Sequence, residues 1–196
     1  VVAAMLRYGV RGQSANEVAR SAVAQFAGLA GLTSADIGAV SRVRGIGPAK
    51  AAQFRAAVEI VKRALRESVA RGDALSSPEA VRDYLRLALA TRPVEVFIGL
   101  FLDTQHRLIA ADELFHGTLA QTSVFPREVV KAALGYNAAA VIFAHNHPSG
   151  VAEPSRADEL LTQSLKSALS LVDIRTLDHF VVAGPTVLSF AERGLI

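Results

Sequence analysis

The sequence predicts an α/β domain, a mixed sheet with flanking helices, preceded by a small all-α domain. Residues 1–72 repeat apolar residues at helical spacing, whereas residues 77–196 alternate short β-branched segments with amphipathic ones. The charge balance changes at the same place. The first 72 residues hold 11 Lys and Arg against 4 Asp and Glu, and the remainder holds 10 against 14. We therefore expect a basic helical domain over 1–72, a linker over 73–76 and a second domain over 77–196.

Composition limits the function classes that are open to the chain. Hydrophobic residues make up 51% of the 196 residues, which is enough to bury a core. No apolar segment approaches the roughly 20 residues that span a bilayer, so we expect no membrane partner. The absence of cysteine excludes disulfides, thiol nucleophiles, cysteine-ligated metal sites and the nucleobase deaminases that hold zinc with cysteines. The first residues lack the basic region of a signal peptide, and position 1 is Val, so we expect a cytoplasmic protein whose true start is missing.

Helices are expected throughout the first domain. The segment after Ser14, a candidate N-cap, repeats apolar residues at helical spacing. A short helix capped by Thr33 or Ser34 is expected to include residues 37–40. Pro48 suits the first turn of a longer helix, which continues for several turns.

The turn Gly45-Ile46-Gly47 joins two of these helices. Glycine allows backbone angles that other residues resist, and the free amides at the start of the second helix can hold a phosphate. The segment resembles the helix-hairpin-helix motif of DNA-binding and DNA-repair proteins. This resemblance implies that Gly45, Ile46, Gly47 and Lys50 contact the DNA backbone without reading bases. An ordinary two-helix turn that needs Gly and Pro explains the same residues, so both interpretations stay open.

The second domain begins where Ser77 and Pro78 are expected to cap and open a helix. Segments rich in β-branched, aromatic and apolar residues and short apolar runs then predict strands, and longer segments between them predict helices. The expected strands are 95–102, 107–115, 138–144, 174–183 and 186–190, and the expected helices are 125–134 and 155–171. This mixed order favours a sheet with helices on its faces.

Chemically active residues gather where the strand over 138–144 ends. His145 and His147 are two residues apart, so on a strand they point to the same face. The loop to Asp158 is long enough to return a carboxylate to them. Two imidazoles and one carboxylate suit Zn²⁺ with a water as fourth ligand, as in catalytic sites. A local alternative is that Ser155 and Asp158 form a capping box, with Asp in place of Glu. The remaining histidines are expected to be structural: His106, His116 and His179.

The complete pattern is His145-x-His147, seven residues, Ser155, two residues and Asp158. It is similar to the JAMM motif of JAB/MPN metalloproteases. The resemblance implies that the two histidines and the aspartate hold one zinc ion per chain, and that Ser155 helps to stabilise the oxyanion.

The same motif includes an upstream glutamate at the start of an early strand, which acts as general base. Glu95 is the matching position here. Glu113 and Glu128 are rivals, although Glu128 is more simply explained as an acidic residue that opens a helix.

Further segments are similar to the RadC family: HNHPSG-x3-PSRAD, residues 125–129 and residues 177–180, behind a helix-hairpin-helix. This resemblance covers nearly the whole chain. It implies a JAB/MPN-type, cytidine-deaminase-like sheet in a bacterial protein that was historically named for DNA repair. The expected activity is hydrolysis of a peptide or isopeptide bond in a peptide or protein substrate, with DNA as a second partner. The alternative is a DNA-associated or protein-interaction module whose metal site is not catalytic.

Overall fold

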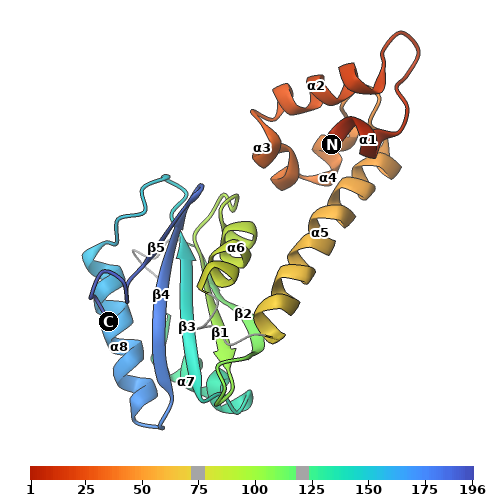
Figure 1. Ribbon diagram of the computed structural model, residues 1–196. Coiled ribbons are helices and arrows are strands. Elements are labelled where there is room, and N and C mark those ends of the chain that lie inside the picture. Colours follow the sequence, from red (N-terminus) through yellow and green to blue (C-terminus); the bar gives the residue numbers. More distant parts are fainter. Residues whose placement is uncertain (72–77, 118–123) are drawn as a thin grey trace. The chain divides into compact units, whose positions relative to one another are not determined.

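The computed structural model describes residues 1–71, 78–117 and 124–196. The chain folds into two compact units, Val1–Ala64 and Leu65–Ile196 (Figure 1). The expected linker over 73–76 and the expected cap Ser77 lie outside the described residues, so both stay predictions.

The N-terminal unit is helical, as the sequence predicts. Its helices are α1 (Val2–Leu6), α2 (Ala15–Gln25), α3 (Leu29–Ser34), α4 (Ile37–Ser41) and the first part of α5 (Pro48–Arg71). Ser14 caps α2 in a full capping box with Glu17, which confirms the predicted start of this helix. The short helices α1 and α3 were not expected from the sequence.

The predicted cap of α4 is wrong. The carboxylate of Asp36 accepts hydrogen bonds from the backbone amides of Gly38 and Ala39, at 2.8 and 3.2 Å, and so caps this helix. Thr33 and Ser34 instead form the last turn of α3, where their hydroxyls donate to backbone carbonyls three and four residues earlier. Burial of Leu32 favours this additional helix, because it places an apolar side chain in the core of the unit.

The turn between α4 and α5 packs tightly against α2. Gly45 has a φ of +91°, and a Cβ atom built on it would lie 2.9 Å from a methyl carbon of Val18. Ile46 is buried in the core of the unit. Gly47, in contrast, has no positive φ and no neighbour within 4 Å of such a Cβ atom. The two glycines of the motif therefore differ, and only Gly45 is required by the packing.

A five-stranded mixed sheet forms the centre of the C-terminal unit, as predicted. Its order is β2-β1-β3-β4-β5; β3 and β4 pair in parallel, and the other neighbouring strands named here pair antiparallel. The strands are β1 (Val96–Leu102), β2 (Leu108–His116), β3 (Ala140–Asn146), β4 (Arg175–Ala183) and β5 (Thr186–Ser189). Every residue of β1 and β3 is buried, as expected for strands that are covered on both faces.

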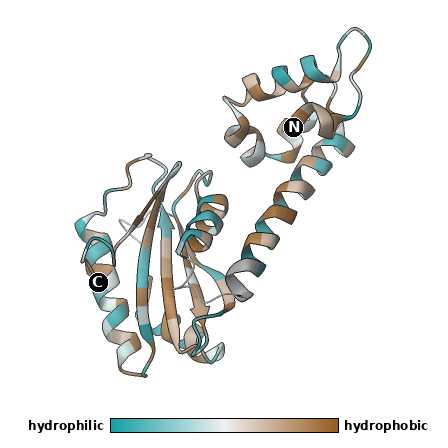
Figure 2. Ribbon diagram, in the orientation of Figure 1, coloured by the Kyte–Doolittle hydropathy of each residue, from teal (hydrophilic) through white to brown (hydrophobic). Residues whose placement is uncertain are grey.

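Helices cover both faces of this sheet. They are α6 (Pro78–Leu89), α7 (Pro126–Gly135) and α8 (Arg156–Ser170). α6 packs on one face, where Leu85 lies with Leu100 and Ile142, and α7 and α8 pack on the other (Figure 1). Figure 2 shows hydrophobic colours along much of β1 and β3 and mixed colours along α8, as expected for a half-exposed helix.

The path of the chain from β3 through α8 to β4 positions the candidate site. A parallel pair needs a crossover connection, and here that connection contains α8. The crossover brings the N-terminus of α8 back toward the end of β3, and ligand sites in α/β sheets commonly lie at such strand ends.

Replacing Gly45 by Ala should destabilise the N-terminal unit by about 1–2 kcal/mol, because a Cβ atom is unfavourable at positive φ and here also meets Val18. Gly47→Ala is the matched control, and it should leave stability unchanged or raise it, since its position is open. Thermal unfolding of both variants measures the difference. Equal losses of stability in the two variants would contradict this account of the turn.

Candidate metal centre

His145, His147 and Asp158 come together where β3 ends and α8 begins, as the sequence predicts. His145 is fully buried within β3. His147 follows this strand, and its backbone amide donates to the carbonyl of Val182 at 2.8 Å, which continues the pairing with β4. Asp158 lies in the first turn of α8, with a side chain that is 3% exposed.

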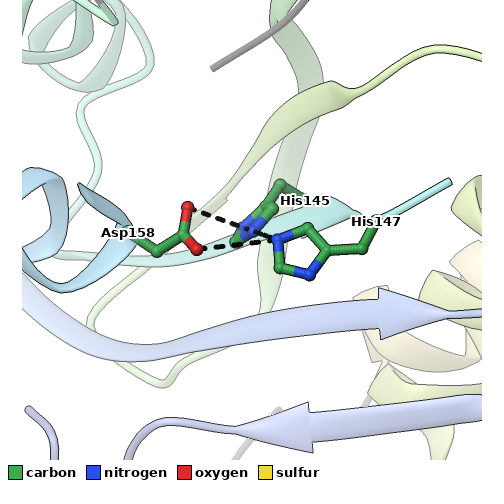
Figure 3. A group of neighbouring side chains, drawn as sticks. All are labelled: His145, His147 and Asp158. Atoms are coloured by element: carbon green, nitrogen blue, oxygen red, sulfur yellow. Dashed lines mark hydrogen bonds and ion pairs between the residues drawn. The ribbon is translucent and has the colours of Figure 1, made fainter. Parts of the chain in front are cut away.

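The three side chains turn toward one another (Figure 3). The two Nε2 atoms lie 2.9 Å apart, and oxygens of Asp158 lie 3.4 Å from that of His145 and 3.6 Å from that of His147. In a tetrahedral zinc site with bonds of about 2.0–2.1 Å, ligand atoms lie about 3.3–3.4 Å apart. The observed separations bracket this value, so the group can hold a metal ion.

Electrostatics at this group favours a positive charge. Burial lowers the pKa of His145 to about 4, so its imidazole is neutral near pH 7. The contact with Asp158 raises the pKa of His147, and the charge of Glu95 adds to this effect. Burial acts to raise the pKa of Asp158, but the two histidines and hydrogen bonds from Ser155 lower it overall. The carboxylate therefore stays ionised, and a proton on His147 would be displaced when a cation binds.

Ser155 and Asp158 also form the capping box that the sequence left as an alternative. The backbone amide and the hydroxyl of Ser155 both donate to one oxygen of Asp158, at 2.7 and 2.6 Å. These bonds hold the carboxylate with its second oxygen toward His145. The two interpretations are therefore compatible, because the cap that starts α8 also orients the candidate ligand.

Glu95 lies beside this group. Glu95 directly precedes β1, and two residues further along this strand Phe97 pairs with His145. The charge of Glu95 raises the pKa of His147. The two rival glutamates are engaged elsewhere. Glu113 pairs with Ile98 on the face that α6 covers and forms ion pairs with Arg92 and His116. Glu128 forms ion pairs with Arg127 and Lys131.

Asn146 holds the segment that carries Glu95, a contact that sequence reasoning missed. Its side-chain oxygen accepts from the amide of Val96 at 2.8 Å, and its amide nitrogen donates to the carbonyls of Arg92 and Val94, at 3.3 and 3.1 Å. This residue stands between the two histidines and is buried. Its position inside the histidine motif was a usable signal, because a polar residue there needs partners.

His179 also belongs to the site, although the sequence suggested only a structural role. It is fully buried on β4, with Nε2 2.8 Å from Nδ1 of His145 and Nδ1 2.6 Å from the hydroxyl of Thr162. The signal that pointed to it was a histidine within an apolar strand, which needs a hydrogen-bonding partner when it is buried.

The residues proposed to contact DNA are largely engaged inside the N-terminal unit. The ammonium group of Lys50 donates to the carbonyls of Tyr8 and Gly45, at 2.8 and 3.1 Å, and lies over the Tyr8 ring. Ile46 is buried and Gly45 packs on Val18. These contacts give the motif a structural role, and DNA contact stays a prediction.

Comparison with known proteins identifies the class and then the family. Residues 75–195 match the model of the RadC-like JAB domain, and residues 1–52 match that of the UPF0758 N-terminal domain. A UPF0758 protein of Nitrosomonas eutropha is 58% identical over 196 residues, which is 100% of this chain and 88% of that protein. A UPF0758 protein of Dechloromonas aromatica is 59% identical over 198 residues, with the same coverage. The chain thus contains a JAB domain with a candidate metal site, and it belongs to the RadC-like family of UPF0758 proteins.

Within residues 1–71, 78–117 and 124–196, no helix is both long and apolar enough to cross a bilayer.

Asn146→Ala should lower the free energy of unfolding by about 1–3 kcal/mol, because it leaves the amide of Val96 and two carbonyls without their partner. Asn16→Ala is the control, since that side chain is exposed, and its effect should stay within about 0.5 kcal/mol. Urea denaturation measures both values. A loss of unfolding free energy as small for Asn146→Ala as for the control would show that these hydrogen bonds do not stabilise the segment before β1.

Proposed function

We propose that this protein is a zinc-dependent hydrolase of peptide or isopeptide bonds, with His145, His147 and Asp158 as the zinc ligands. The observation that carries the proposal is the convergence of two imidazole nitrogens and one carboxylate within 2.9–3.6 Å. Two nitrogens and one oxygen form a donor set that suits Zn²⁺. Membership of the RadC-like JAB family is compatible with a metal-dependent hydrolase.

The number of protein ligands supports a catalytic site over a structural one. Structural zinc sites close their coordination with four protein ligands, whereas catalytic sites use three and keep one position for water or substrate. Among the described residues, the group contains three candidate ligands. When bound, zinc supplies Lewis acidity, which lowers the pKa of water to about 7 and polarises a carbonyl group.

Glu95 is the proposed general base. In the proposed reaction its carboxylate takes a proton from the attacking water as the water oxygen bonds to the carbonyl carbon. Glu95 then gives this proton to the amine nitrogen as the carbon–nitrogen bond breaks, so the products are an acid and an amine. Its place beside His147 supports this role.

Ser155 has two proposed tasks. Its single hydroxyl proton is donated to Asp158 at 2.6 Å, which supports a role in orienting the ligand. The family resemblance implies a second role at the oxyanion, and for that role the hydroxyl would have to turn from Asp158 toward the substrate.

A DNA-associated or protein-interaction module with a non-catalytic metal site is the alternative. The role of Glu95 distinguishes the hydrolase from this alternative, because metal binding alone does not require that carboxylate.

Glu95→Gln should keep bound zinc but lower turnover by roughly 10²–10⁴-fold, since Gln cannot accept the proton. The substrates are libraries of quenched peptides and isopeptide-linked peptides, and cleavage is followed by fluorescence and mass spectrometry in the zinc-loaded protein.

Glu128→Gln is the matched control, because Glu128 pairs with Arg127 and Lys131 away from the site and should leave cleavage unchanged. Cleavage by Glu95→Gln at the wild-type rate would overturn the assignment of the general base. Zinc binding without cleavage of any library member by the wild type would favour the non-catalytic alternative.

A further inference from the structure

A chain of three buried hydrogen bonds leads from the first turn of α8 to the imidazole of His145. Thr162 Oγ1 lies 2.6 Å from the carbonyl of Asp158, and also 2.6 Å from Nδ1 of His179. Nε2 of His179 lies 2.8 Å from Nδ1 of His145. Thr162, His179 and His145 are each fully buried, so water does not compete for these bonds.

The direction of every bond in this chain follows from counting protons. A carbonyl oxygen only accepts, so the single hydroxyl proton of Thr162 is donated to Asp158. The oxygen of Thr162 must then accept from Nδ1 of His179, which therefore carries the proton of that ring.

The proton positions on His179 and His145 follow in the same way. His179 is fully buried, and its two ring nitrogens face a hydroxyl and a second imidazole, neither of which compensates a positive charge, so the ring is neutral. With its proton on Nδ1, His179 offers a lone pair at Nε2, and this atom accepts from Nδ1 of His145. A neutral His145 then has no proton left for Nε2, the atom that faces His147 and Asp158.

Aromatic rings hold His179 in this orientation. Phe97 meets its ring edge-on with 5.3 Å between the ring centroids, and the ring of Phe190, which directly follows β5, lies tilted at 4.7 Å. Phe97 also stacks parallel to His145, at 6.2 Å. The two imidazoles therefore lie in an apolar enclosure in which neither ring can turn without losing packing.

We propose that His179 and Thr162 are positioning residues that fix His145 in its Nδ1–H tautomer, with the Nε2 lone pair directed at the metal. The inference rests on the proposed zinc site and adds the residues that prepare it. Metal-binding histidines generally donate their second ring nitrogen to a partner that fixes the tautomer. His147 follows this rule through a backbone carbonyl, since its Nδ1 lies 2.7 Å from the oxygen of Val151. For His145, the partner is a second histidine, which itself needs Thr162 to set its proton.

In this arrangement the hydroxyl of Thr162 determines which ring nitrogen of His145 carries the proton, although Thr162 is not itself a candidate ligand. Without that hydroxyl, Nδ1 of His179 has no acceptor, and the proton of this ring is better placed on Nε2. It would then be donated to Nδ1 of His145, and the proton of His145 would move to Nε2, where it blocks the ligand position.

The first test is the tautomer of His145 in the metal-free, unmodified chain at pH 8, read from imidazole ¹⁵N chemical shifts. We expect the proton on Nδ1. A proton on Nε2 of His145 would overturn the inference. This result does not depend on zinc binding or on activity, so it separates failure of the inference from failure of the proposed function.

The second test compares Thr162→Val with Thr162→Ser, which removes or keeps the hydroxyl with little change of volume. Zinc affinity is measured by competition with a chromophoric chelator, beside the same ¹⁵N spectra. Thr162→Val should weaken zinc binding by about 10–100-fold and move the His145 proton to Nε2. Thr162→Ser should keep the wild-type tautomer and an affinity within about threefold. Wild-type affinity and tautomer in a folded Thr162→Val variant would overturn the proposal.

Discussion

The structure of this site depends on the lone pairs of three side chains that meet at one point: those of His145 and Asp158 are buried, and that of His147 is partly buried. Two imidazole nitrogens and a carboxylate lie within 2.9–3.6 Å of one another, and a cation between them would satisfy their lone pairs. The surrounding hydrogen bonds satisfy the outer atoms of these groups. Ser155 bonds one oxygen of Asp158, Val151 accepts from His147, and His179 lies at Nδ1 of His145. What remains is a set of inward-facing acceptors, which suits a cation.

The sheet assembles this set with a short stretch of chain. The tripeptide of residues 145–147 places two candidate ligands on one side of the strand, while Asn146 between them holds the backbone before β1. The parallel crossover through α8 returns Asp158 to the same strand end. The two histidines and the candidate base are thus positioned by the adjacent strands β3 and β1, whose residues are all buried, and α8 supplies Asp158. A rigid sheet favours fixed separations between these groups.

Local features could be predicted from the sequence, and contacts between distant segments could not. The spacing of His145, His147 and Asp158 and the capping box are visible within fourteen residues, so the candidate ligands were found. The contacts of His179 with His145 and Thr162 join three elements across 34 and 17 residues, and they depend on the pairing of β3 with β4 and on the packing of α8 against the sheet. The cap of α4 was misplaced for a similar reason, since burial of Leu32 favours an extra helix over Thr33 and Ser34.

The metal content of the purified protein tests the central claim most directly. Zinc is measured by inductively coupled plasma mass spectrometry in the wild type and in the His145→Ala/His147→Ala double variant, after both are supplied with zinc and dialysed. The account predicts about one zinc ion per chain in the wild type and none in the folded double variant. A wild type without zinc, or a double variant that retains it, would contradict the account.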